Sequence, residues 1–137
     1  VGAASTIKMM QSVVVKGIEA LCAEAFLGSE RAGVTEEVMK SLKRTYPGLN
    51  WQEVAAYHLG RMALHGARRA AEMRASAQTL QALGVDSFVV DGIAARQQWA
   101  SDLSLKSFVN GAGPLPVPDY GIAVGVAEKQ DNKEMSK

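Results

Sequence analysis

Apolar side chains recur at steps of three and four residues over the first thirty positions of the chain. The recurring positions are Ile7, Met10, Val14, Ile18 and Leu21. This spacing is typical of the apolar face of a helix. The other faces of the segment are only weakly polar, and a helix that is apolar nearly all round is usually packed on several sides. We therefore predict a long central helix over residues 4–31, ended by Gly33.

Three further helices are expected after it. The first covers residues 35–46, and the last covers roughly residues 88–105. Between them, a long helical segment runs from residue 51 to about 83, with a break near residues 64–66. Asn50 precedes this segment with a glutamate three residues later, which is the spacing of a capping box.

The distribution of proline and alanine favours an all-α fold. Prolines are absent from residues 1–46 and 48–113, and the 137 residues include 21 alanines, the best helix formers. We predict a helical bundle around the long central helix, forming one domain over residues 1–109. Residues 110–137 are rich in Gly and Pro at first and polar at the end. They are expected to form an irregular tail whose last ten residues are disordered.

Composition narrows the class of protein. Apolar residues make up 47% of the chain and charged residues 21%, so a core can form. The net charge of +1 excludes a strongly basic nucleic-acid binder. No apolar run has the length of a membrane span, so no membrane partner is expected. The single cysteine, Cys22, excludes an intrachain disulfide and is compatible with a reducing compartment, and we expect a cytoplasmic protein.

The chain opens with Val-Gly-Ala-Ala, without an initiator Met. It also lacks the basic region and apolar stretch of a signal peptide. We expect it to be a piece of a longer protein.

Lys8 is the first candidate for chemistry, because it is the only charged residue among the first fifteen. Ser5, Gln11 and Ser12 lie three or four residues from it and share its helical face, which makes a short polar strip. A lysine at this position either reaches bulk solvent near the helix end or faces a cleft. In a cleft, burial lowers the pKa of a lysine amine and lets it act as a general acid/base.

A second polar stripe lies in the middle of the third helical segment. Its members are His65, Arg68, Arg69 and Glu72. Their spacing of i, i+3, i+4 and i+7 places them on one helical face. Paired guanidinium groups beside a histidine suit a carboxylate or phosphate, which they bind through two parallel hydrogen bonds. The same spacing also fits an ordinary helix surface on which Glu72 neutralises one of the arginines.

Structural roles are expected for the other chemically distinctive residues. Glu24 falls on the apolar rhythm of the first helix, so we expect a buried carboxylate paired with an arginine of the third segment. Cys22 is interpreted as a small core residue. His58 and His65 lack partners at metal-ligand spacing, so no metal site is predicted.

Two stretches of the sequence resemble a known family. Residues 2–10, Gly-Ala-Ala-Ser-Thr-Ile-Lys-Met-Met, resemble the glycine-to-lysine motif that opens the C-terminal helical domain of β-hydroxyacid dehydrogenases and 6-phosphogluconate dehydrogenases. Residues 65–73, His-Gly-Ala-Arg-Arg-Ala-Ala-Glu-Met, are similar to a subgroup of 6-phosphogluconate dehydrogenase-like proteins whose C-terminal domain has no assigned function. The resemblance covers residues 2–107.

The resemblance implies a function and a site. In the family, an N-terminal Rossmann domain binds NAD or NADP, and the helical domain closes the active-site cleft and forms a homodimer. Lys8 would be the general acid/base for hydride transfer from a small anionic hydroxy acid. Ser5, Gln11, Ser12, His65, Arg68 and Arg69 would bind this substrate. The Rossmann domain is absent from this chain, so the fragment alone is expected to be inactive.

The chain also departs from the family pattern. Ser12 stands where the family usually has an asparagine, four residues after the lysine. The preceding position, often histidine or asparagine in the family, is Gln11, and the second glycine of the motif is Ala4. These changes argue against a true 6-phosphogluconate dehydrogenase. A third possibility is a relative of the family that reduces imines. Such relatives carry other residues at the lysine position, so Lys8 argues against it. The alternative function is a non-catalytic helical module that pairs with a copy of itself.

Overall fold

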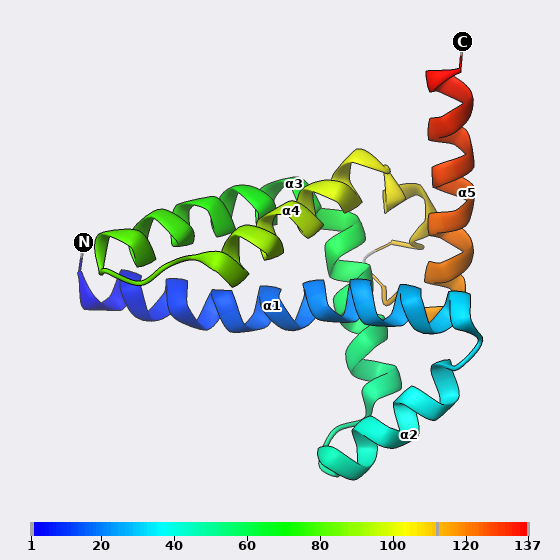
Figure 1. Cartoon of the computed structure of the whole chain (residues 1–137), viewed down its shortest axis with the longest axis horizontal. Helices are drawn as coiled ribbons and strands as arrows, with labels where there is room; N and C mark the ends of the chain where they lie inside the picture. Colours follow the sequence, from blue (N-terminus) through cyan, green and yellow to red (C-terminus); the bar gives the residue numbers. More distant parts are fainter. Residues whose placement is uncertain (1, 112, 137) are drawn as a thin grey trace.

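The computed structural model describes residues 2–111 and 113–136, and Val1, Ala112 and Lys137 lie outside the described residues. In chain order the elements are α1 (Ala3–Ala32), α2 (Thr35–Thr45), α3 (Trp51–Ala82), α4 (Phe88–Asp102), the 3₁₀ turn η1 (Leu105–Phe108) and α5 (Val117–Met135). The predicted all-α fold is confirmed (Figure 1). In the described part of the chain, no helix combines the length and apolar character needed to cross a membrane.

Several local predictions are confirmed. Gly33 ends α1 in the left-handed conformation, with φ of 71°. The backbone N–H of Glu53 donates to Oδ1 of Asn50 over 3.2 Å, which caps α3. The expected break in α3 lies at His65, whose φ of −130° and ψ of 18° are not helical.

This break sets the architecture. The first half of α3 crosses α1, whereas the second half turns and runs beside α4 (Figure 1). α3 packs more extensively on α4 than on any other element, and α1 packs against both. The bundle is therefore organised around the bent α3 as much as around α1.

The bend also divides the interior into two cores. The larger core lies between the C-terminal half of α1, the first half of α3 and α5, and includes Phe26, Leu59 and Tyr120. The smaller core joins α1 to the second half of α3 and to α4, and includes Met73 and Ile93. Buried polar side chains of α1, α3 and α4 also meet in the interior, namely Glu19, Arg69 and Gln97.

The apolar face predicted for α1 is only partly buried, since Ile18 packs against the larger core but the other half of the face does not. Ile7, Val14 and Leu21 are 70%, 62% and 67% exposed, whereas the helix buries the face that carries Ala23 and Phe26. A helix that is apolar nearly all round leaves its periodicity ambiguous about which face packs. The face of α1 that packs inward carries small side chains such as Ala23, which let other helices approach closely.

The prediction of an irregular tail was also wrong. Residues 117–135 form α5, which buries Val117, Tyr120, Ala123, Val124 and Ala127. The Tyr120 hydroxyl donates to the carbonyl oxygen of Ala23 over 2.6 Å and fastens α5 to α1. Pro118 lies in the first turn of this helix, where the missing N–H costs nothing. The prolines mark a helix start, and tertiary packing stabilises the helix beyond them.

Candidate functional site

The polar strip of α1 faces a pocket against the second half of α3. The pocket has a volume of about 420 Å³. Its lining residues are Ser5, Lys8, Met9, Gln11, Ser12, Lys16, Arg68, Glu72, Ala75 and Ser76. We call it the Lys8 pocket. It brings the predicted strip of α1 together with one arginine of the predicted α3 stripe.

Lys8 lines this pocket but its side chain is exposed. Lys16, two turns further along α1, is the more enclosed amine, with a side chain only 16% exposed. Its Nζ lies 3.8 Å from Oε2 of Glu72. Burial lowers the pKa of Lys16, and the nearby charge of Arg69 adds to this effect, while Glu72 opposes it. The pocket therefore holds two amines in different environments.

The predicted α3 stripe is divided among three environments. Arg68 lines the Lys8 pocket with a side chain that is 61% exposed, and its Nη1 lies 3.5 Å from Oε1 of Glu72. Arg69 is buried and points into the interior of the bundle. His65 lines a different cavity, at the bend of α3. The structure thus brings Arg68 to Lys8 but does not bring His65 or Arg69 there.

Arg69 belongs to a buried polar cluster around Glu19, which is 0% exposed. Oε2 of Glu19 lies 3.3 Å from Nη1 of Arg69 and 3.2 Å from Nδ1 of His58. Oε1 accepts a hydrogen bond from Nε2 of Gln97 over 2.9 Å. We call these four residues the Glu19 cluster. It joins α1, α3 and α4 between the two cores, and it places the charge of Arg69 close behind Lys16.

The expectation for Glu24 was wrong in both respects. Its side chain is 69% exposed, and its partner is Arg96 of α4, with Nη2 at 2.8 Å from Oε1. The buried side of α1 carries Glu19, Cys22 and Phe26, and Glu24 does not lie on this side.

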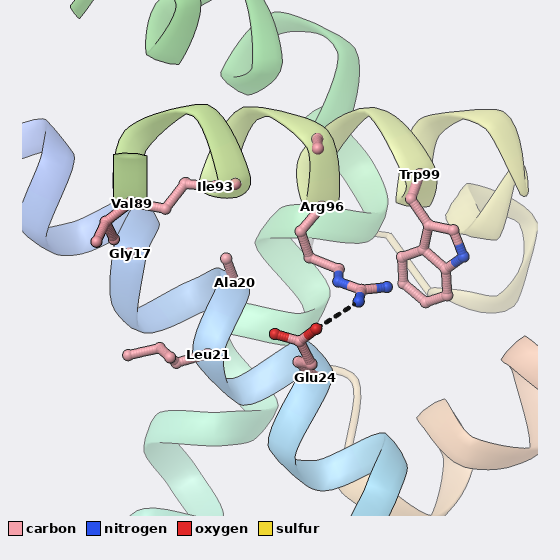
Figure 2. A pocket seen from close by; sticks show the side chains of 10 residues that line it. Gly17, Ala20, Leu21, Glu24, Val89, Ile93, Arg96 and Trp99 are labelled. Atoms are coloured by element: carbon pink, nitrogen blue, oxygen red, sulfur yellow. Dashed lines mark hydrogen bonds and ion pairs between the residues drawn. The ribbon is translucent and has the colours of Figure 1, made fainter. Parts of the chain in front are cut away.

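The Glu24–Arg96 pair borders a shallow trough between α1 and α4 (Figure 2). The floor of the trough is made by small residues, among them Gly17, Ala20 and Gly92. The Arg96 guanidinium also lies 4.7 Å from the centre of the Trp99 ring, a cation–π contact. Leu21 and Val89 stand at the edges, 67% and 74% exposed. Apart from the one ion pair, the lining is apolar.

Cys22 is a buried core residue, as interpreted from the sequence. Burial raises the pKa of its thiol to about 11, and the neighbouring Glu19 carboxylate contributes in the same direction. Such a thiol is a poor nucleophile at neutral pH. Within residues 2–111 and 113–136, no group of three or more His, Cys, Asp or Glu side chains is placed to hold a metal ion.

Sequence reasoning missed Lys16 and Glu19. Lys16 continues the strip of Ser5, Lys8 and Ser12 by one more turn, and this continuation was the available signal. Glu19 lies three residues further along the same face. On an apolar helix, spacing alone did not separate this buried carboxylate from the exposed Glu24.

Comparisons with known proteins agree with the fold. Residues 29–100 match the family model described as a domain of unknown function, DUF1932. A solved structure described as a conserved hypothetical protein from Sinorhizobium meliloti 1021 is 32% identical, with a TM-score of 0.78. The match covers 92% of this chain and 42% of that protein, so the chain spans less than half of its length. Among curated proteins, none matches the sequence.

Proposed function

The chain belongs to the family of the domain of unknown function DUF1932, known as the C-terminal helical domain of 6-phosphogluconate dehydrogenase-like proteins, and from this premise we propose its function. It forms the substrate-binding half of a cytoplasmic NAD- or NADP-dependent dehydrogenase that oxidises a small anionic hydroxy acid. The N-terminal Rossmann domain of the same protein carries the dinucleotide, which supplies the hydride acceptor. Lys8 is the general acid/base.

The observation that supports this proposal is the composition of the Lys8 pocket. Lys8, Lys16 and Arg68 give it three cationic side chains against one carboxylate, that of Glu72. Arg68 suits the carboxylate of a hydroxy acid, since a guanidinium binds it through two parallel hydrogen bonds. Ser5, Gln11 and Ser12 add neutral hydrogen-bonding groups to the same lining.

The residues of the pocket fit the substrate half of the reaction and not the dinucleotide. The described residues form no strand–helix unit of the kind that holds a dinucleotide. The dinucleotide, which the Rossmann domain would hold, would take up hydride from the hydroxyl carbon of the substrate. The hydroxyl proton passes to the Lys8 side chain, and a carbonyl group forms. Lys16 and Arg68 hold the anionic end of the substrate so that the hydroxyl lies at Lys8.

Exposure of Lys8 agrees with a cleft that is open on one side. Lys8 lies near the N-terminal end of α1, which Figure 1 places at one end of the molecule beside the turn between α3 and α4. We place the Rossmann domain over this end. A covering domain excludes water and strengthens the electrostatic interactions inside the cleft.

Substitution of Lys8 in the complete two-domain enzyme tests this function. Lys8→Arg keeps the positive charge but is a poor proton acceptor, so turnover should fall by roughly 10²–10⁴-fold. Steady-state kinetics should find KM for the hydroxy acid little changed, and fluorescence titration should find the same affinity for the dinucleotide. Lys43→Arg, on an exposed lysine of α2, is the matched control. Turnover of Lys8→Arg equal to that of the control would exclude Lys8 as the general acid/base.

A second role is favoured by the exposed apolar stripe of α1. Ile7, Val14 and Leu21 are spaced seven residues apart, lie on one line along the helix and are all more than half exposed. The apolar trough between α1 and α4 lies beside the same line. We therefore also propose that this face pairs with the same face of a second copy to form a homodimer. Sedimentation of the chain, with and without charged substitutions in the stripe, tests this role.

A further inference from the structure

A second cavity lies at the bend of α3, where three unusual backbone features meet. His65 interrupts the helix, with φ of −130°. Gly66 comes next, and a Cβ on it would lie only 2.7 Å from the carbonyl oxygen of Gln97, so glycine permits the close crossing of α4. After α4, Ser104 adopts the left-handed conformation, with φ of 57°, and turns the chain into η1. These features bring the bend of α3 and residues 101–107 to one place.

The cavity, here called the bend pocket, has a volume of about 790 Å³. Its polar lining consists of the cationic or basic residues His65, Arg68 and Lys106 and the hydroxyl residues Ser101, Ser104 and Ser107. None of its ten lining residues is a carboxylate, and the carboxylate of Glu72, 3.5 Å from Nη1 of Arg68, lies outside the lining. This distinguishes it from the Lys8 pocket, which includes Glu72, and from the trough, which includes Glu24.

The electrostatic surroundings of His65 also favour an anionic ligand. Partial burial lowers the pKa of His65, and the charges of Arg61, Arg68 and Arg69 lower it further, while Glu19 only partly opposes them. Burial and the surrounding positive charge both make the protonated form of His65 less favourable. An anion in the bend pocket would offset that charge and allow His65 to become a third cation.

We propose that the bend pocket binds the phosphate group of a small phosphate monoester. Three hydroxyl groups and three basic side chains supply donors suited to the three terminal oxygens of a phosphate. The volume exceeds the need of a single phosphate ion, so the organic part of the ligand has room in the same cavity. The proposal does not rest on the dehydrogenase function. Nine of the ten residues that line the bend pocket are not part of the Lys8 pocket, and the two pockets share Arg68 alone.

The test is direct binding to the 137-residue chain, without turnover. The chain is titrated with glycerol 1-phosphate, inorganic phosphate and glycerol at constant ionic strength, and backbone amide shifts are monitored by NMR. Saturable shifts confined to residues 63–68 and 101–107 are expected with glycerol 1-phosphate. Inorganic phosphate should bind more weakly at the same amides, and glycerol should produce no shifts. Equal affinity for inorganic phosphate would overturn the monoester assignment, and shifts spread over unrelated basic surfaces would overturn the site.

Lys106→Ala and a matched control test the residues. Lys106 is exposed, so its replacement leaves the core intact, and affinity should fall by roughly 10–100-fold, the usual effect of losing a hydrogen bond to a charged group. Lys129→Ala, on an exposed lysine of α5, should bind as the unmodified chain does. Affinity of Lys106→Ala equal to that of the control would overturn the proposal.

The contribution of His65 is read from pH dependence, with sulfate as the probe because its charge is constant over the range. Bound anion stabilises the imidazolium, so affinity should rise as pH falls from about 8 to about 5.5. The charged groups that face His65 are Arg61, Arg68, Arg69, Glu19 and Lys106. His65→Gln should remove the rise, whereas Lys106→Ala should retain it at lower affinity. A flat profile for the unmodified chain would overturn the assignment of His65 to the site.

Discussion

Glu19 is a charged residue that the fold buries completely. An isolated carboxylate in the interior is strongly unfavourable, so its three partners, Arg69, His58 and Gln97, are essential to its burial. Two polar atoms of the cluster, Nε of Arg69 and Oε1 of Gln97, have no hydrogen-bond partner within the described residues. The cluster is thus tightly paired at its centre and incompletely satisfied at its edges. Removal of the central carboxylate leaves a buried cation without compensation.

We predict that Glu19→Ala lowers the free energy of unfolding by about 3–5 kcal/mol, the usual cost of leaving one member of a buried ion pair alone. Urea unfolding at neutral pH measures this change. Asp131→Ala, on an exposed carboxylate of α5, should change stability by less than about 0.5 kcal/mol. The double variant Glu19→Leu, Arg69→Met should recover much of the loss, because no unpaired charge remains. A stability of Glu19→Ala equal to that of Asp131→Ala would contradict this account.

The candidate site was predictable where chemistry and spacing were both local. The strip of Ser5, Lys8 and Ser12 lies on one helix, and the structure places all three on one pocket. The α3 stripe was not predictable in the same way, because the bend at His65 changes the direction in which successive side chains point. Arg69 turns into the interior for a further reason, which is that Glu19 on another helix offers it a buried partner. Single-helix spacing contains no information about such a partner.

At the scale of the elements, the crossing of α3 and α4 depends on Gly66. Its missing side chain leaves room for the carbonyl oxygen of Gln97 and the amide nitrogen of Ser101, which would lie 2.7 Å and 3.2 Å from a Cβ. Both are backbone atoms, so neither can rotate away. The helices would have to separate to accept even a methyl group.

Gly66→Ala should therefore destabilise the chain by about 1–3 kcal/mol, although alanine is the better helix former. Gly28→Ala is the matched control, because nothing lies within 4 Å of its Cβ position in α1. It should stabilise the chain by up to about 1 kcal/mol. Thermal unfolding of the two variants should move the midpoint in opposite directions. An increase in the midpoint of Gly66→Ala would contradict this prediction, because it would mean that the crossing of α3 and α4 accepts a methyl group.

The elements themselves were largely predictable, and the two errors share a physical cause. The prediction of helices over residues 1–109 and of the bend in α3 rested on apolar spacing, capping residues, proline, glycine and alanine, all of which act along the local chain. The inner face of α1 and the existence of α5 depend on what packs against them. Tyr120, for example, stabilises α5 through the carbonyl oxygen of Ala23, 97 residues away in sequence. Neither local propensity nor spacing contains that contact.

At the scale of the whole molecule, α1 carries a polar surface and an exposed apolar surface on opposite sides. Lys8, Ser12 and Lys16 line a polar pocket against α3, whereas Val14 and Leu21 form an exposed apolar line. With 3.6 residues per turn, these two sets lie on opposite faces of the helix. A second copy can therefore cover the apolar face without closing the Lys8 pocket. The small net charge of +1 gives little repulsion between two copies.

Leu21→Glu should convert the homodimer to a monomer, because a carboxylate placed at the centre of an apolar contact loses its water without gaining a partner. Leu21 is exposed in the single chain, so circular dichroism should find the same helical content, with a melting temperature lowered only by the loss of the partner copy. Sedimentation equilibrium at micromolar concentrations measures the effect, and the dimer dissociation constant should rise by at least about 100-fold. Ile122→Glu places the same charge on an equally exposed apolar residue of α5, away from the stripe, and should leave the dimer intact. A monomeric unmodified chain, or equal weakening by both substitutions, would refute pairing through α1.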